Sequence, residues 1–171
     1  MIDTEILNKQ SGLSSGIKLK LNSLSDHRMI DKLYEASRAG VKIQLIVRGL
    51  CCLIPGIDGL SENIEVISII GKFLEHPRLF IFDNNGNNSI YISSADFMGR
   101  NLDNRVEISC PIYDEDIKKQ ILEMFAIGWS DNVKAREISA TNDNAYRVNS
   151  LPTVRSQFAM YEYYLDKLKD K

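Results

Sequence analysis

Two segments with strand patterns flank one segment with a helical pattern, and this arrangement constrains the fold most. Residues 17–21 alternate apolar and basic side chains, which is typical of a strand with one buried face. Residues 26–39 have helical spacing, and Gly40 follows where a helix commonly ends. Residues 41–47 are rich in apolar and β-branched side chains, as in a central strand. A strand–helix–strand unit places its two strands parallel in one sheet, so the sequence predicts an α/β domain.

The rest of the chain extends this pattern into a mixed β-sheet flanked by helices. Residues 64–70 predict another strand, and residues 79–82 and 90–93 flank an Asn-rich turn that predicts a hairpin. Residues 105–110 predict a strand. Asp114 is the expected N-cap of a helix that ends at Gly128. Residues 132–150 have no clear pattern. Residues 153–169 predict a last helix that packs through Phe158, Tyr161, Leu165 and Leu168.

Composition limits the class of protein. The 171 residues fit one domain, expected over residues 1–171. Lys and Arg number 21 against 23 Asp and Glu, so no global basic field favours a nucleic-acid partner, although a local basic pocket remains compatible. Arg48 interrupts the longest apolar stretch, which is too short for a transmembrane segment. We predict a cytoplasmic protein, in keeping with the reduced thiols expected below, and leave membrane association open.

The cysteines do not form an evident disulfide framework. Cys51 and Cys52 are adjacent and Cys110 is the third, so we expect reduced and mostly buried thiols. No base is recognisable near Cys51 and Cys52, which disfavours a cysteine nucleophile. His27, expected at the surface, and His76 are the two histidines, so no metal site is predicted.

The pair His76 and Arg78 carries the clearest chemistry. The two residues are two positions apart, so in an extended segment their side chains point to the same side. An imidazole can carry a proton or act as a nucleophile, and a guanidinium neutralises phosphoryl oxygens. The alternative is a histidine that caps a strand beside a solvated arginine. Ser93, Ser94, Asp96 and Asn101 follow one hairpin later and are candidates for the same region.

Further basic residues lie where strands are expected to end. Arg48 follows a predicted central strand and precedes a glycine, which favours a place at the carboxyl rim of the sheet; a surface salt bridge is the alternative. Lys18 and Lys20 share one strand face and either extend a basic lining or face solvent. Asp96 either anchors one of the arginines Arg48, Arg78 and Arg105 or caps a turn.

Five runs resemble the C-terminal catalytic domain of type 1 polyphosphate kinases, and the resemblance covers essentially the whole chain. They are residues 17–24 (IKLKLNSL), 43–56 (IQLIVRGLCCLIPG), 60–66 (LSENIEV), 73–78 (FLEHPR) and 92–105 (ISSADFMGRNLDNR). The resemblance implies a phospholipase D-like fold. It also implies that this chain is the second of two such domains in a longer, homo-oligomeric subunit that also has an N-terminal and a head domain.

The family reaction is reversible transfer of the ATP γ-phosphate to polyphosphate through a phosphohistidine. The resemblance makes Arg48 a nucleotide-phosphate contact, His76 the second active-site histidine, and Arg105 a phosphate-binding residue. Arg78 stands where the wider phospholipase D signature has Lys, and Asp83 lies near the spacing of that signature's Asp. ATP or ADP and polyphosphate are the implied partners. The accepting histidine and the Mg²⁺ ligands belong to parts outside this chain, so we expect the chain to fold alone without making polyphosphate.

Two alternatives belong to other functional classes. A homodimeric phospholipase D-like phosphodiesterase or nuclease would take one His-x-Arg pair from each subunit. A non-catalytic module would use the same basic rim to bind polyphosphate or a nucleotide.

Overall fold

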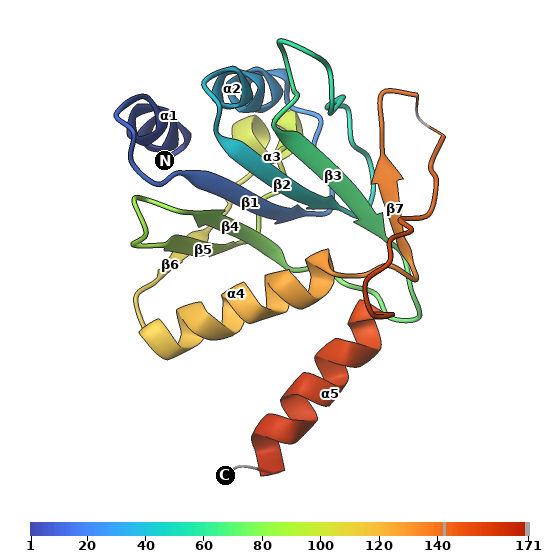
Figure 1. Cartoon of the computed structure of the whole chain (residues 1–171). Coiled ribbons are helices and arrows are strands. Elements are labelled where there is room, and N and C mark those ends of the chain that lie inside the picture. Colours follow the sequence, from blue (N-terminus) through green and yellow to red (C-terminus); the bar gives the residue numbers. More distant parts are fainter. Residues whose placement is uncertain (142, 170–171) are drawn as a thin grey trace.

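The protein is built around one mixed sheet, described by a computed structural model over residues 1–141 and 143–169. The seven strands lie in the order β6-β5-β4-β1-β2-β3-β7 (Figure 1). The strands are Gly16–Leu21 (β1), Lys42–Val47 (β2), Ile64–Ile69 (β3), Arg78–Phe82 (β4), Ser89–Ser93 (β5), Ser109–Ile112 (β6) and Ala135–Ile138 (β7). The helices are Ile2–Gln10 (α1), His27–Arg38 (α2), Gly99–Asn104 (α3), Glu115–Trp129 (α4) and Ser156–Lys169 (α5). The predicted α/β class with a mixed sheet is confirmed.

The strand directions bring the ends of several strands to one edge of the sheet. β1 and β2 are parallel and in register from Ile17↔Ile43 to Leu21↔Val47, and β3 continues the parallel set. β4 runs antiparallel to β1, with Lys20 opposite Leu79. The ends of β1, β2 and β3 therefore lie beside the start of β4. We call this edge the carboxyl rim; it is marked by Leu21, Val47, Ile69 and Arg78.

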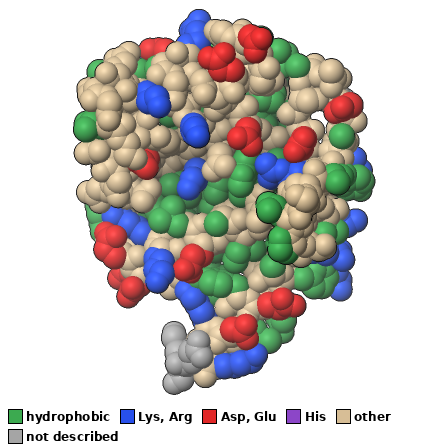
Figure 2. All heavy atoms as spheres, viewed as in Figure 1, with side chains coloured by type: hydrophobic (Ala, Val, Ile, Leu, Met, Phe, Trp, Pro, Cys, Tyr) green, Lys and Arg blue, Asp and Glu red, His purple; other side chains and the backbone are tan. Residues whose placement is uncertain are grey.

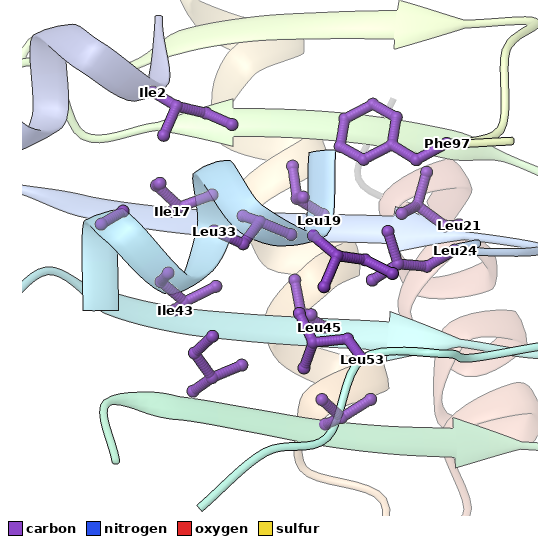
Figure 3. Close-up of a cluster of buried hydrophobic side chains, with 14 of the residues drawn as sticks. Ile2, Ile17, Leu19, Leu21, Leu24, Leu33, Ile43, Leu45, Leu53 and Phe97 are labelled. Atoms are coloured by element: carbon purple, nitrogen blue, oxygen red, sulfur yellow. The ribbon is translucent and has the colours of Figure 1, made fainter. Parts of the chain in front are cut away.

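Each face of the sheet has its own apolar core. Helices α1 and α2 cover one face, where Leu19, Leu33 and Leu45 are fully buried (Figure 3). Helix α4 covers the other face, where Ile46, Ile81 and Phe125 are buried. Burying one such side chain contributes roughly 1.5–3 kcal/mol, so the two layers hold the central strands rigidly. On the side of the molecule shown in Figure 2, basic and acidic side chains are interspersed. In the described part of the chain, no helix is long and apolar enough to cross a membrane.

The helix ends follow local sequence signals. Asp26 caps α2 by accepting a hydrogen bond from the Met29 N–H over 3.1 Å. Gly40 follows α2 with a φ of +87°, a conformation that glycine adopts without strain. Asp114 caps α4 through the Ile117 N–H at 3.0 Å, as predicted.

Several elements differ from the predictions. Helix α4 does not end at Gly128 but runs to Trp129. A Cβ on Gly128 would lie 3.3 Å from the Ile46 Cδ1, so this glycine allows close helix–sheet packing. The strand predicted over residues 105–110 begins only at Ser109, and the short helix α3 precedes it. The unassigned segment contains β7, an edge strand antiparallel to β3.

The predicted packing face of the last helix is mostly wrong: only Phe158 is partly buried, with its ring centroid 6.1 Å from that of Phe73. Tyr161 and Leu168 are 66% and 70% exposed, whereas Ser156 and Gln157 at the start of α5 are buried. Helical spacing identified a row of apolar side chains on this helix, but the neighbouring loop and α4 decide which face of the helix is buried. The prediction of mostly buried thiols is also wrong, because Cys52 and Cys110 are exposed and only Cys51 is partly buried.

Candidate active site

A buried carboxylate organises the carboxyl rim. Asp96 follows β5 and is 2% exposed. Its Oδ2 accepts a hydrogen bond from Arg78 Nη2 at 2.8 Å. Its Oδ1 accepts from the backbone N–H groups of Asn22 and Ser23 at 2.7 and 3.0 Å. Burial favours the neutral acid, but the hydrogen bonds from Arg78, Ser23 and Asn22 outweigh it and hold the pKa of Asp96 below its ordinary value. Asp96 thus both anchors an arginine and caps the turn after β1.

Arg78 stands at the first position of β4 and is fixed from one side. Its side chain is 14% exposed and pairs with Asp96. Its Nε is buried and has no hydrogen-bond partner among the described residues, and its Nη1 is 3.5 Å from the backbone oxygen of His76. These contacts hold the guanidinium at the rim, where its positive charge can attract an anion.

Arg48 lies on the same rim, one residue beyond β2. Its Nε donates to the side-chain oxygen of Asn22 at 3.0 Å, and its Nη2 contacts the same oxygen. No acidic side chain pairs with Arg48 in the described part of the chain, so the surface salt bridge is not present there. Asn22 was not singled out from the sequence. Its place directly after β1 was the available signal.

Gly49 brings the ends of β1 and β2 together behind Arg48. The Gly49 N–H donates to the Asn22 carbonyl oxygen at 2.7 Å. A Cβ at Gly49 would lie only 2.9 Å from that same oxygen. The glycine after Arg48 therefore permits a close approach that fixes Asn22, and Asn22 links Arg48 to the Asp96–Arg78 pair.

His76 is exposed in the loop that joins β3 to β4. It lines a pocket of about 270 Å³ together with Lys20, Leu79, Met124 and Gln157, among others. Lys20 forms an ion pair with Glu75, the residue before His76. Lys20 therefore belongs to this region. Lys18 does not, since it is exposed and lines a separate hollow at the opposite end of β1.

Arg48 and His76 lie on adjoining pockets of the same rim. Arg48 and Asn22 line a hollow of about 350 Å³, and its wall includes Phe73 and Leu74. Those two residues also line the pocket of His76. The structure thus gathers both residues around one loop, although no hydrogen bond joins their side chains.

Arg105 is the least constrained of the predicted residues. It follows α3, is exposed, and makes no hydrogen bond or ion pair among the residues described. The nearby carboxylate of Glu107, not predicted from the sequence, accepts hydrogen bonds from Ser94 and Asn101. These bonds lower the pKa of Glu107; burial opposes them, and the charges of Arg105 and Arg78 add smaller effects in the lowering direction.

Two other candidates lie outside this cluster or lack reactivity. Asp83 follows β4 at the end away from the rim, where it accepts from the Gly86 N–H at 2.8 Å and so stabilises the hairpin turn. Burial raises the pKa of the Cys51 thiol to about 11, which leaves it protonated and weakly nucleophilic. Within residues 1–141 and 143–169, no cluster of three or more His, Cys, Asp or Glu side chains could hold a metal ion.

Comparisons with known proteins give consistent matches. A family model described as "Polyphosphate kinase C-terminal domain 2" matches residues 1–157. The polyphosphate kinase of Klebsiella pneumoniae is 52% identical over 165 residues, which are 95% of this chain and 24% of that protein. The polyphosphate kinase of Escherichia coli strain K12 is 48% identical over 165 residues, again 95% of this chain and 24% of the relative. This chain therefore spans about a quarter of the length of these relatives.

Solved structures agree with the sequence matches. The crystal structure of polyphosphate kinase from Porphyromonas gingivalis superimposes with a TM-score of 0.97 at 42% identity, covering 99% of this chain and 26% of that one. The phospholipase D family member Nuc from Salmonella typhimurium gives a TM-score of 0.57 at 15% identity, covering 78% of this chain and 88% of Nuc. The second match concerns the fold alone, and it identifies that fold as phospholipase D-like.

Proposed function

The chain belongs to the family of polyphosphate kinase C-terminal domains, and on this premise we propose that it forms half of a kinase active site. The reaction is reversible transfer of the ATP γ-phosphate to polyphosphate. A phosphohistidine carries the phosphate on a domain outside this chain. That domain supplies the nucleophile, and the carboxyl rim described above supplies charge and positioning.

One observation carries the proposal: two guanidinium groups are held at the rim by a continuous set of hydrogen bonds. Asp96 holds Arg78, and Asn22 holds Arg48, while the Asn22 backbone is itself bound by Asp96. Phosphoryl transfer depends mainly on positioning and on neutralising the charge of the transferred group. Donors that are already fixed lose little free energy through reorganisation when the charge develops.

His76 is the candidate proton carrier. It is exposed beside Arg78 and lines a pocket at the rim, so it can meet a phosphate held by the arginines. An imidazole gives and takes a proton near neutral pH. We assign His76 to the leaving nucleotide oxygen, opposite the nucleophile of the other domain. Arg105, on its exposed segment, adds charge near the polyphosphate.

We assign Mg²⁺ to parts of the kinase outside this chain, as the family resemblance implies; among the described residues, no group of three or more His, Cys, Asp or Glu side chains could hold a metal ion. The ion, when bound by other parts of the kinase with ATP, would neutralise phosphate charge. The steps assigned to this domain use only its arginines and His76.

The test is ATP-dependent polyphosphate synthesis by the full-length kinase that contains this domain. Arg48→Ala and Arg78→Ala should each lower turnover by about 10²–10³-fold, the loss expected when one preorganised donor to developing charge is removed. Arg38→Ala is the matched control, because Arg38 is an exposed arginine in the last turn of α2. Equal turnover in all three variants would contradict the proposal.

Two other results would favour the alternative classes. Release of nucleotides from DNA by this chain would support the dimeric nuclease. Saturable polyphosphate binding by the full-length protein without any turnover would support a binding module.

A further inference from the structure

We infer that Gln157, on helix α5, is a positioning residue for His76. This inference rests on the proposed function, in which His76 acts on the reacting phosphate. Gln157 makes no hydrogen bond with the His76 side chain. Gln157 binds the loop that directly precedes His76, and thereby connects the last helix of the chain to the carboxyl rim.

The amide of Gln157 clamps the backbone and one side chain of this loop. Its Oε1 accepts from the Phe73 N–H at 2.9 Å, and its Nε2 donates to the Phe73 carbonyl oxygen at 2.7 Å. The same Nε2 donates to Glu75 Oε1 at 2.8 Å. Both N–H groups and the oxygen of the amide are therefore used, and the side chain is buried at 9% exposure.

Glu75 ties the same loop to the sheet. Its second carboxylate oxygen pairs with Lys20 of β1, while its first accepts from Gln157. His76 follows immediately, and its own side chain makes no hydrogen bond within the described residues. The backbone on its two sides therefore sets where the side chain of His76 begins: the segment held by Gln157 before it, and Arg78 at the start of β4 after it.

Gln157 is itself held by a buried carboxylate. Asp131, at the end of α4, is fully buried. Its Oδ2 accepts from the backbone N–H and the hydroxyl of Ser156, each at 2.7 Å. Its Oδ1 accepts from the Lys134 and Ala135 N–H groups at 2.6 and 2.9 Å. The first turn of α5 is therefore fixed to α4 and β7, so Gln157 is a rigid support rather than a mobile one.

Gly71 offers an independent way to disturb the same contact. A Cβ at Gly71 would lie 2.3 Å from Gln157 Oε1 and 2.7 Å from its Cδ, while the φ of Gly71 is one that alanine also adopts. The methyl group of Gly71→Ala would therefore displace the Gln157 amide without changing Gln157. Two substitutions on separate elements, Gln157→Ala and Gly71→Ala, should thus have the same consequence.

The experiment is steady-state kinetics of the full-length kinase with ATP and polyphosphate. Gln157→Ala and Gly71→Ala should each lower kcat by about 10²-fold, the loss typical of a misplaced catalytic group, with little change in the KM for ATP. Gln157→Glu should also lower kcat, because it removes both donors and sets a carboxylate beside Glu75. Gly16→Ala is the control: its Cβ would make only ordinary contacts at 3.8 Å, and kcat should be unchanged.

A double-substitution cycle separates positioning from general damage. If Gln157 acts through His76, Gln157→Ala should cost almost nothing further when His76→Gln is already present. A full additional loss in that background would overturn the inference. Unchanged kcat in Gln157→Ala and Gly71→Ala, with His76→Gln inactive, would also overturn the inference. That result would leave the proposed function intact. Full activity of His76→Gln would instead contradict the proposed role of His76, and the inference with it.

Discussion

Arg78 and Asp96 form an ion pair at 2.8 Å in which the carboxylate is 2% exposed and the guanidinium side chain 14% exposed. The pair joins the start of β4 to the segment after β5, and Asp96 also binds the turn after β1. Three parts of the chain that are distant in sequence thus depend on one carboxyl group. Removing one member of a buried pair leaves the other without compensation, which costs more than the pair itself contributes.

Asp96→Ala should therefore destabilise the fold strongly. We expect the free energy of unfolding to fall by about 3 kcal/mol, because Arg78 and two backbone N–H groups lose their acceptor. Urea denaturation measures this change. Asp103→Ala is the matched control, since Asp103 pairs with Arg28 at the surface and such pairs contribute about 0.2–1 kcal/mol. Similar losses in the two variants would contradict the role assigned to Asp96.

Acid should weaken the fold through the buried carboxylates of Asp96 and Asp131. Hydrogen bonds hold the pKa values of Asp96 and Asp131 below their ordinary value, although burial opposes this. In the unfolded chain the pKa of an Asp is about 3.9. As the pH falls, the unfolded chain therefore binds protons at these carboxylates before the folded protein does. The stabilisation is complete above that pH and is lost below it.

Unfolding by urea at a series of pH values from neutral to acidic checks this expectation. The free energy of unfolding should decrease below about pH 4, where unfolded Asp becomes protonated. In Asp96→Asn the decrease should be shallower, because Asp96 no longer titrates. An equally steep decrease in that variant would show that Asp96 does not contribute to acid sensitivity.

Gly49→Ala should loosen the support of Arg48. The added Cβ would meet the backbone oxygen of Asn22 at 2.9 Å, and backbone cannot move aside as a side chain does. We expect a loss of about 1–3 kcal/mol in the free energy of unfolding, as for other overpacked sites. Thermal denaturation measures it, with Gly16→Ala as the matched glycine variant. Unchanged stability would mean that the ends of β1 and β2 tolerate separation.

The three thiols should react at different rates. Cys52 and Cys110 are exposed, whereas burial raises the pKa of Cys51 to about 11. Because the thiolate is the reacting species, iodoacetamide near pH 8 should modify Cys52 and Cys110 well before Cys51. Mass spectrometry of peptides after short exposure distinguishes the sites. Early modification of Cys51 would contradict its buried environment.

The central elements could be predicted because their patterns are local. Alternation identified β1, and the Asn-rich turn identified the β4–β5 hairpin. Helix α1 is short, and β7 is a polar edge strand of four residues, so neither carries a strong pattern. Gly128 resembled a helix end because the sequence does not reveal that Ile46 packs against it.

The residues of the candidate site also divide into those that local sequence signals identify and those whose roles depend on the fold. Arg48 was singled out because it follows a predicted strand, and Arg78 because it lies two positions from His76; both signals are local in the sequence. Asn22, Glu107 and Gln157 were missed because their roles depend on contacts made only after folding. Gln157, for example, binds Phe73, which lies 84 positions away in the chain. Hydrogen-bonding side chains of this kind look like ordinary polar residues until their partners are known.

The most direct test of the account is the turnover of full-length kinase carrying His76→Gln. Glutamine keeps much of the hydrogen-bonding shape of histidine but cannot transfer a proton near neutral pH. We predict that ATP-dependent polyphosphate synthesis falls by about 10²–10⁴-fold, the usual contribution of a general acid or base. Polyphosphate synthesis at the rate of the unsubstituted enzyme would contradict the claim that this rim forms half of the active site through His76.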